Sequence, residues 1–326
     1  MVIEEIFVDV VIIAYNHEKF IEKTLTGVLA QKTNFPVRIN VYNDCSPDGL
    51  DAVIKGVIAQ NRTNVIINYV NQPVNLGMCQ NLRMAFKSCT APYIALCDGD
   101  DYWIDEYKLQ KQTDFLNSHR DVGLVYTDIN IYYEQSGIFK NSVFHSSHVP
   151  YTEYKDLIFQ RYIAPCSWVY RSDLMDEKMY EEISDSIDIT FVMMLLISLK
   201  SKIHFLDEVT AVYRALPESA SSSKNPFKIY VREVRLWETQ HHFLKNHKRI
   251  DIEDEVNNIF LNKCLLSVFL YQDWKTFMEI KKIKIPDDSR FKLLIRLINN
   301  KTVFNIIASI LKIKYSSIIK EAKREY

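Results

Sequence analysis

One short segment of the chain reads Ile94-Ala95-Leu96-Cys97-Asp98-Gly99-Asp100-Asp101-Tyr102-Trp103. Its apolar half predicts a buried strand, which runs directly into three carboxylates within four residues. Carboxylates crowded in this way repel one another, and a bound divalent cation would remove that cost. Oxygen ligands suit Mg²⁺ or Mn²⁺, and substrate phosphates often complete the coordination shell. The segment therefore predicts a metal–phosphate site, with a solvated acidic loop that caps the next helix as the alternative.

Outward from this segment, the first 130 residues alternate between the periods of strands and helices. Short, β-branched apolar runs predict strands at residues 7–13, 37–42, 65–70, 93–97 and 123–128. Amphipathic stretches predict helices at residues 19–31, 50–60, 78–88 and 108–117. This alternation is typical of an α/β fold with a parallel sheet and helices on both faces.

In parallel sheets of this kind, ligands bind at the carboxyl ends of the strands. The loops at that edge are predicted at residues 14–16, 43–49, 71–77 and 98–103. The chain has only seven glycines, and Gly49, Gly77 and Gly99 fall in three of these loops. Glycine permits close approach of the backbone to a ligand, although any tight turn also favours it. In the second loop, Asp44 is placed to accept hydrogen bonds from a nucleotide base or ribose.

From about residue 225 the pattern becomes helical, which predicts two domains, 1–224 and 225–326.

Charge is distributed unevenly along the chain. Residues 279–326 hold 12 Lys/Arg and 5 Asp/Glu, a net charge of +7, whereas the remainder carries −8. The last helix that the pattern predicts, residues 303–314, is apolar at Val303, Ile306, Ile307, Ile310, Leu311 and Ile313. We expect this basic amphipathic tail either to contact an anionic membrane surface or to pack on the domain with a solvated basic face.

The composition of the 326-residue chain excludes several classes of protein. Hydrophobic residues make up 48% and charged residues 25%, which argues against intrinsic disorder. A net charge of −1 carries no polycationic signature for nucleic acid. The six cysteines form no C-x-x-C pair and are interpreted as reduced thiols. The acidic start of the chain, and a longest apolar stretch confined to residues 191–199, predict a cytoplasmic protein that does not span a membrane.

Four regions, taken together and in this order, resemble the family 2 glycosyltransferases. They read VVIIAYNHEKFI at 10–21, NDCSPDG at 43–49, GDDYW with KLQKQ at 99–103 and 108–112, and FLDEV with VYR at 205–209 and 212–214. The resemblance implies a GT-A fold, which has a Rossmann-like, mostly parallel sheet with flanking helices, followed here by a helical C-terminal region. It also implies a nucleotide-sugar donor, here expected to be UDP-linked, and inversion at the anomeric carbon.

The resemblance assigns roles to individual residues around the donor. Ala14, Tyr15 and Asp44 would hold the base and ribose. Asn43 stands where the family often has Asp, so contacts to the ribose would be weaker. The family's loop near the donor corresponds to Asn75, Gly77 and Asn81.

At the diphosphate, the resemblance places Asp98 and Asp100 around the phosphates and the cation, with both as metal ligands. Asp101 would hold the donor sugar or support the loop. Arg214 would contact phosphate through its planar fork or act as a structural ion-pair partner.

The family also requires a general base that takes the proton from the acceptor hydroxyl. The corresponding region reads Ser184-Asp185-Ser186-Ile187-Asp188-Ile189. We favour Asp188, because the apolar run after it continues like the family's helix, and Asp185 is the second candidate. An Asp at either position would also suit a helix N-terminus.

These features predict a metal-dependent, inverting transferase that moves one sugar to a hydroxyl of a glycan or lipid-linked glycan, in surface polysaccharide synthesis at the inner face of the membrane. The absence of a Q-x-x-R-W motif argues against a processive synthase. Two alternatives are a sugar-binding scaffold with decayed catalytic residues and a nucleotidyltransferase of related fold. The latter normally carries a Gly-rich N-terminal loop with a Lys or Arg, which residues 14–17 lack.

Overall fold

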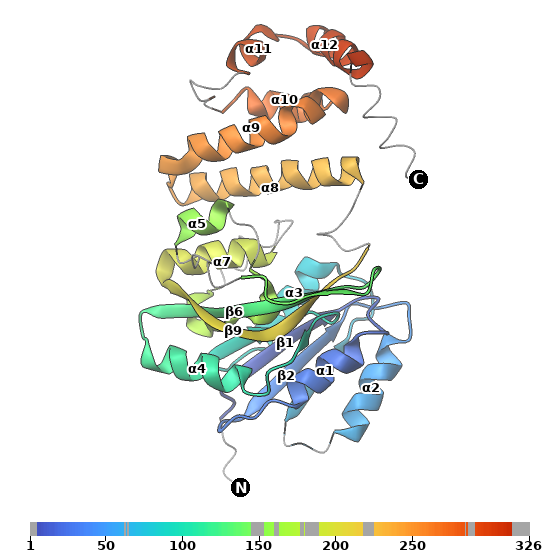
Figure 1. Cartoon of the computed structure of the whole chain (residues 1–326), viewed down its shortest axis with the longest axis vertical. Coiled ribbons are helices and arrows are strands. Elements are labelled where there is room, and N and C mark those ends of the chain that lie inside the picture. Colours follow the sequence, from blue (N-terminus) through green and yellow to red (C-terminus); the bar gives the residue numbers. More distant parts are fainter. Residues whose placement is uncertain are drawn as a thin grey trace. The chain divides into compact units, whose positions relative to one another are not determined.

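A computed structural model of the chain describes residues 5–61, 63, 65–144, 153–159, 163–176, 179, 189–217, 225–283, 285 and 291–314. The chain groups into two compact units, Met1–Pro217 and Glu218–Tyr326, called unit 1 and unit 2 (Figure 1). Each unit has its own buried core, and each is described separately below.

Unit 1 begins with regular alternation of strands and helices. Its first part comprises β1 (Val8–Ala14), α1 (Ile21–Leu29), β2 (Val37–Asn43), α2 (Leu50–Gln60), β3 (Ile66–Asn71), α3 (Met78–Lys87), β4 (Tyr93–Leu96), β5 (Tyr102–Trp103) and α4 (Lys108–Ser118). Its second part comprises β6 (Val122–Tyr133), β7 (Ile138–Lys140), α5 (Tyr154–Phe159), β8 (Val169–Arg171), α7 (Ile189–Lys200) and β9 (Lys202–Ala215). Every strand and helix predicted in the first 130 residues is present, and all but the last strand lie within a few residues of their predicted bounds.

Within the described residues, nine strands form one sheet in the order β3-β2-β1-β4-β8-β6-β9-β5, with β7 paired to β6. Strands β3, β2, β1 and β4 are parallel, as the alternation predicted. The predicted strand at 123–128 became the much longer β6, and it does not lie beside β4. The three-residue strand β8 lies between them and is antiparallel to both. A strand this short carries too little pattern to be recognised from sequence.

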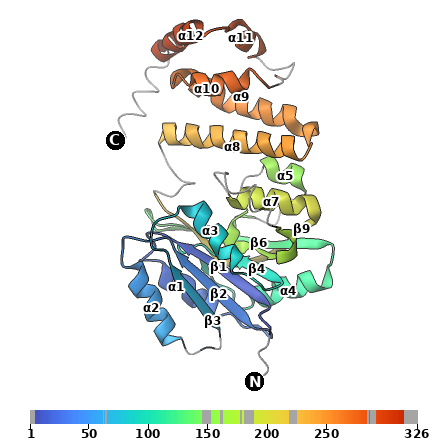
Figure 2. The same cartoon turned by 180° about the vertical axis from the view of Figure 1, so that it is seen from behind.

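The parallel half of the sheet is covered on both faces, because alternate side chains of each strand point to opposite sides. On one face, Val10 and Ile12 of β1 share a fully buried cluster with Leu25 of α1 and Leu50 of α2. Helix α3 covers the opposite face (Figures 1 and 2). The core therefore holds the strands rigidly and leaves their carboxyl ends to carry the loops.

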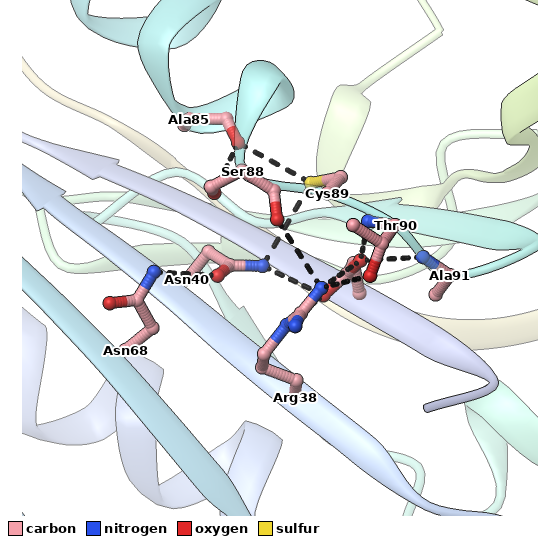
Figure 3. Close-up of polar contacts among 9 residues, drawn as sticks. Arg38, Asn40, Asn68, Ala85, Ser88, Cys89, Thr90 and Ala91 are labelled. Atoms are coloured by element: carbon pink, nitrogen blue, oxygen red, sulfur yellow. Dashed lines mark hydrogen bonds and ion pairs between the residues drawn. The ribbon is translucent and has the colours of Figure 1, made fainter. Parts of the chain in front are cut away.

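Near the amino ends of these strands, a buried ion pair joins three segments (Figure 3). Asp9 of β1 is fully buried, and both of its oxygens accept hydrogen bonds from Arg38 of β2, at 2.7 and 2.8 Å. Its carboxylate also accepts from Asn40 at 2.9 Å and from the N–H groups of Thr90 and Ala91 at 2.8 and 2.9 Å. Burial would raise the pKa of Asp9, but these hydrogen bonds outweigh burial and hold it below its usual range.

Unit 2 consists of α8 (Pro226–Asn246), α9 (Glu253–Leu270), α10 (Trp274–Ile280), α11 (Lys292–Leu297) and α12 (Lys301–Lys314). Helix α8 begins where Asn225 accepts hydrogen bonds from the N–H groups of Phe227 and Lys228, with Pro226 at the first helical position. Helices α8 and α9 pack together through the stacked rings of Trp237 and Phe260, 4.4 Å apart. Among the described residues, no helix combines the length and the apolar character needed to cross a bilayer.

The Asp9 network predicts a large loss of stability for Asp9→Asn. Removing one partner of a buried ion pair typically costs about 3 kcal/mol or more, because the remaining groups lose their compensation. Urea unfolding at pH 7 measures this loss. The lowered pKa means that wild type gains stability from Asp9 above the ordinary value of 3.8 and loses it as the pH falls through the folded-state value. The difference between wild type and variant should therefore shrink in acid.

Asp121→Asn is the matched control, because Asp121 pairs with Lys202 at an exposed site of the same unit. We expect this variant to unfold close to wild type. Equal losses in the two variants would contradict a special role for the Asp9 network.

Candidate active site

The predicted loops meet at the carboxyl edge of the sheet, and hydrogen bonds join them to one another. The Asp44 N–H donates to the carbonyl of Ala14 at 3.0 Å. The N–H of Asn16 donates to Ser46 Oγ at 2.8 Å. Asn16 adopts a φ of 59°, in the left-handed region that Asn tolerates better than most residues. The first and second loops are thus tied together side by side.

The third loop is held by the second, and the residues that hold it are buried. Asp44 is 3% exposed, and its Oδ1 accepts from the N–H of Leu76 at 2.7 Å. The carbonyl of Asn43 accepts from the N–H of Gln72 at 2.9 Å, and Asn43 Oδ1 accepts from the N–H of Ser46 at 3.0 Å. The Asn43 side chain therefore organises its own loop, and the Asp44 side chain ties the second loop to the third.

Three further predicted donor-site residues differ in how accessible they are. Asn81 is buried on α3, where its Nδ2 donates to the carbonyl of Tyr42 at 3.0 Å and its Oδ1 accepts from Gln72. Asn75 is exposed, and its Oδ1 accepts from the N–H of Gly77 at 3.0 Å. Gly77 has a φ of 79°, which explains the glycine at the start of α3. Asn81 thus serves the scaffold, while Asn75 and Gly77 lie where a ligand could reach them.

The loop at residues 98–103, here called the acidic loop, is packed tightly against the first loop, residues 14–16. The N–H of Gly99 donates to the carbonyl of Ile13 at 2.9 Å. A Cβ at position 99 would lie 2.7 Å from His17 Nδ1 and 2.8 Å from Ala14 Cβ, so only glycine fits there. From α1, the buried hydroxyl of Thr24 contacts the carbonyl of Gly99 at 3.0 Å and that of Asp101 at 2.6 Å. The position of these carboxylates is therefore set by α1 and β1.

Of the three loop carboxylates, Asp101 is directed inward. It is 1% exposed, and its Oδ1 accepts from the N–H of Arg214 on β9 at 2.8 Å. Burial raises the pKa of Asp101 well above its usual range, and the charges of Asp100 and Asp98 raise it further. This geometry favours the loop-supporting role over contact with the donor sugar.

Arg214 is also turned into the structure. Its Nε donates to the carbonyl of Asp100 at 2.9 Å, and its Nη1 forms an ion pair with Glu134, the residue directly after β6. The guanidinium carbon lies 4.6 Å from the centre of the Phe20 ring and 5.5 Å from that of Tyr132. These contacts favour the structural ion-pair role for Arg214 over contact with phosphate.

Asp98 and Asp100 remain partly exposed at the same edge. Asp100 is 15% exposed in its side chain, and its Oδ2 lies 3.9 Å from Nε2 of His17. Burial lowers the pKa of His17, while the charges of Asp100 and Asp48 act against that shift. Sequence reasoning missed His17 as a neighbour of the acidic loop, although its place just after the first loop was a usable signal. In the described part of the chain, no three His, Cys, Asp or Glu side chains are arranged to hold a metal ion by themselves.

Trp103, at the end of the acidic loop, and Lys108 and Gln112, which follow it in the chain, make buried contacts that support it. The indole N–H of Trp103 donates to the carbonyl of Cys166 at 2.8 Å. Lys108 is fully buried with its Nζ over the Trp103 ring, and it donates to Gln112 Oε1. Burial lowers the pKa of Lys108 to about 7. Gln112 Nε2 in turn donates to the carbonyls of Val125 and Ser167. These contacts lock the strand that follows the loop.

The remaining predicted residues are Tyr15 and the two candidate bases. Tyr15 is 42% exposed at the mouth of the first loop, where a planar base could stack on it. Asp188 and Asp185 lie outside the described residues. The structure thus brings Ala14, Tyr15, Asp44, Asn75, Gly77, Asp98 and Asp100 to one edge of the sheet.

Comparison with known sequences finds relatives for much of the chain. An uncharacterized protein of Mycobacterium tuberculosis is 28% identical over 239 residues, which is 72% of this chain and 64% of that protein. The match therefore spans less than two thirds of that relative. An uncharacterized glycosyltransferase of Methanocaldococcus jannaschii is 24% identical over 177 residues, which is 54% of this chain and 59% of that protein.

Comparison with solved structures identifies the fold. The structure of residues 1–349 of S. aureus TarS, in complex with UDP-GlcNAc, matches with a TM-score of 0.63 over 96% of this chain and 92% of that chain. The sequences are 17% identical, so this likeness concerns the fold alone. It confirms the predicted GT-A fold. The family model for glycosyl transferase family 2 matches residues 9–177, just over half of the chain, and the protein therefore belongs to glycosyl transferase family 2.

Proposed function

We propose that unit 1 binds a nucleotide-sugar at the joined loops and transfers the sugar, with inversion, to a hydroxyl of a glycan or lipid-linked glycan. The observation that carries this proposal is the convergence of the loops, which puts Asp98 and Asp100 beside Ala14 and Asp44 at the carboxyl edge of the sheet. In parallel α/β sheets that edge is where nucleotides bind. Membership of glycosyl transferase family 2 supports the same reaction class.

A UDP-linked donor would lie with its base against Tyr15 and its ribose near Asp44. The backbone N–H of Leu76 already fixes one oxygen of Asp44, which orients the carboxylate. The TarS structure holds UDP-GlcNAc on the same fold, which supports a uridine donor here. Asn75 and Gly77 border the same entrance from the third loop.

The carboxylates of the acidic loop suit a divalent cation that takes few of its ligands from the protein. Asp98 and Asp100 offer carboxylate oxygens at a partly exposed site, beside the buried carboxylate of Asp101. Mn²⁺ or Mg²⁺ usually fills the rest of its shell with phosphate and water oxygens. When bound, such a cation would stabilise charge on the departing diphosphate. Asp101, held by Arg214, would keep the loop in place.

On the acceptor side, Asp188 would remove the proton from the attacking hydroxyl. The oxygen of the acceptor hydroxyl then forms a bond to the anomeric carbon. The bond from that carbon to the diphosphate breaks on the opposite side, which inverts the centre. Asp185 is the second candidate for this role. An acceptor carried on a lipid would fit surface polysaccharide synthesis at the inner face of the membrane.

The donor proposal predicts that Asp100→Ala abolishes metal-dependent nucleotide binding. We expect one nucleotide among UDP, GDP, CMP and TDP to raise the melting temperature of wild type in the presence of Mn²⁺. A ligand at 100 times its Kd stabilises by about 2.7 kcal/mol, which gives a clear shift. Asp100→Ala should lose the Mn²⁺-dependent part of that shift.

Asp114→Ala is the control for this experiment, because it removes an exposed carboxylate on α4, away from the acidic loop. It should respond to nucleotide as wild type does. If no nucleotide shifts wild type, or if Asp100→Ala keeps the full Mn²⁺-dependent shift, the proposed donor site is wrong.

The catalytic proposal predicts that Asp188→Asn binds donor normally and fails to turn it over. Loss of a general base typically costs about 10²- to 10⁴-fold in rate. Release of nucleotide from the sugar donor measures turnover without knowledge of the acceptor, and the thermal shift reports on binding. Asp185→Asn is the matched control and should retain most activity. A larger loss in Asp185→Asn would exchange the two roles, whereas turnover unaffected by either change would contradict both assignments.

A further inference from the structure

The end of unit 2 exposes a group of large apolar side chains. Six lie within residues 291–314, and we call them the outer face: Leu293, Leu297, Val303, Ile306, Ile310 and Ile313. Ile313 is 77% exposed and Leu293 is 69% exposed. Single exposed leucines are ordinary on protein surfaces, whereas several large apolar side chains on one side of a helix form the kind of surface that binds a partner.

Helix α12 has two apolar faces, one buried and one exposed. Phe304 and Ala308 are fully buried. The Phe304 ring lies 4.9, 5.3 and 5.0 Å from the ring centres of Phe269, Trp274 and Phe277 on α9 and α10, which anchors the helix in the unit's core.

The opposite face of α12 is formed by Val303, Ile306, Ile310 and Ile313. Their spacing of three and four residues places them on one side of a helix. One face of α12 therefore packs within unit 2, and the other remains exposed.

Helix α11 repeats this arrangement on a smaller scale. Ile295 and the following Ile298 are buried, and Lys281 Nζ donates to the carbonyl of Ile298 at 2.7 Å, which fixes the end of the helix. Leu293 and Leu297 are four residues apart and exposed. Both views show α11 and α12 as neighbours (Figures 1 and 2). Two anchored helices therefore present apolar side chains outward.

The charged residues within 291–314, the segment that carries the outer face, are all of one sign. Residues 291–314 contain no acidic residue and five basic ones, Lys292, Arg296, Lys301, Lys312 and Lys314. Apolar side chains inserted at the level of the head groups, with bases around them, are the pattern by which helices bind anionic bilayers. A symmetric second copy would instead bring the same positive charges together across an interface, which is unfavourable. Charge complementarity therefore favours lipid over a second copy.

We propose that unit 2 docks on an anionic membrane surface through the outer face, with Ile306, Ile310 and Ile313 inserted among the lipids. This proposal does not depend on the donor site, because docking needs neither nucleotide nor acceptor. It would hold the enzyme on the surface where a lipid-linked acceptor is found.

The test is sedimentation of the full-length protein with vesicles of phosphatidylcholine containing phosphatidylglycerol, and with vesicles of phosphatidylcholine alone. We expect wild type to bind the anionic vesicles more tightly, and less tightly at high salt. The triple variant Ile306→Ser, Ile310→Ser, Ile313→Ser should lose about tenfold or more of that binding, and so should Lys312→Glu with Lys314→Glu. Matched controls are Ile66→Ser with Ile138→Ser, and Lys140→Glu with Lys245→Glu, which change exposed residues outside the outer face.

An Ile310→Trp variant reports on insertion itself, since brominated lipids quench only an indole that enters the bilayer. We expect quenching beyond that of the unsubstituted protein. Thermal unfolding of each variant checks that the fold is kept, which the exposure of these side chains predicts. Three results would overturn the proposal: no binding of wild type to anionic vesicles, equal binding by the triple variant, or a wild-type dimer that the triple variant converts to monomer.

Discussion

Repulsion among the three carboxylates of the acidic loop is the constraint around which unit 1 is arranged. The loop removes one of the three from the surface, because Asp101 is buried and accepts a hydrogen bond from the backbone of Arg214. Arg214 then braces the same loop through the carbonyl of Asp100 and an ion pair to Glu134. The other two carboxylates, Asp98 and Asp100, stay partly exposed at the carboxyl edge. The proposed cation with its phosphates would offset the cost of crowding these charges.

The buried carboxylates at the two ends of the parallel strands have opposite electrostatic environments. At the amino end, Asp9 receives hydrogen bonds from Arg38, Asn40 and two backbone N–H groups, so its charge is compensated within the protein. At the carboxyl end, burial and neighbouring charges raise the pKa of Asp101 well above its usual range. The hydrogen bonds to Asp9 stabilise the sheet, whereas at the carboxyl end the proposed cation would offset the negative charge. This asymmetry agrees with the general placement of ligand sites in parallel sheets.

Several residues with a family resemblance proved to support the site. Asn81 ties α3 to β2, Asn43 organises the second loop, and Lys108 with Gln112 holds the strand after the acidic loop. A sequence motif does not separate a residue that touches a ligand from one that positions its neighbour. The structure adds their exposure: Tyr15 and Asn75 are exposed, whereas Asn43 and Asn81 are buried.

The sequence by itself determined the strands and helices of the first 130 residues, the loops at the carboxyl edge and the acidic segment, because the signals involved are local in the chain. Periodicity and turn residues act over a few positions, and the family motifs lie in those loops. Only the tertiary structure decided that β8 lies between β4 and β6, that Asp101 and Arg214 turn inward, and that α12 buries Phe304 while exposing Ile310. Each of these outcomes depends on contacts between residues far apart in the chain. An amphipathic pattern does not indicate which other element packs against each face of a helix.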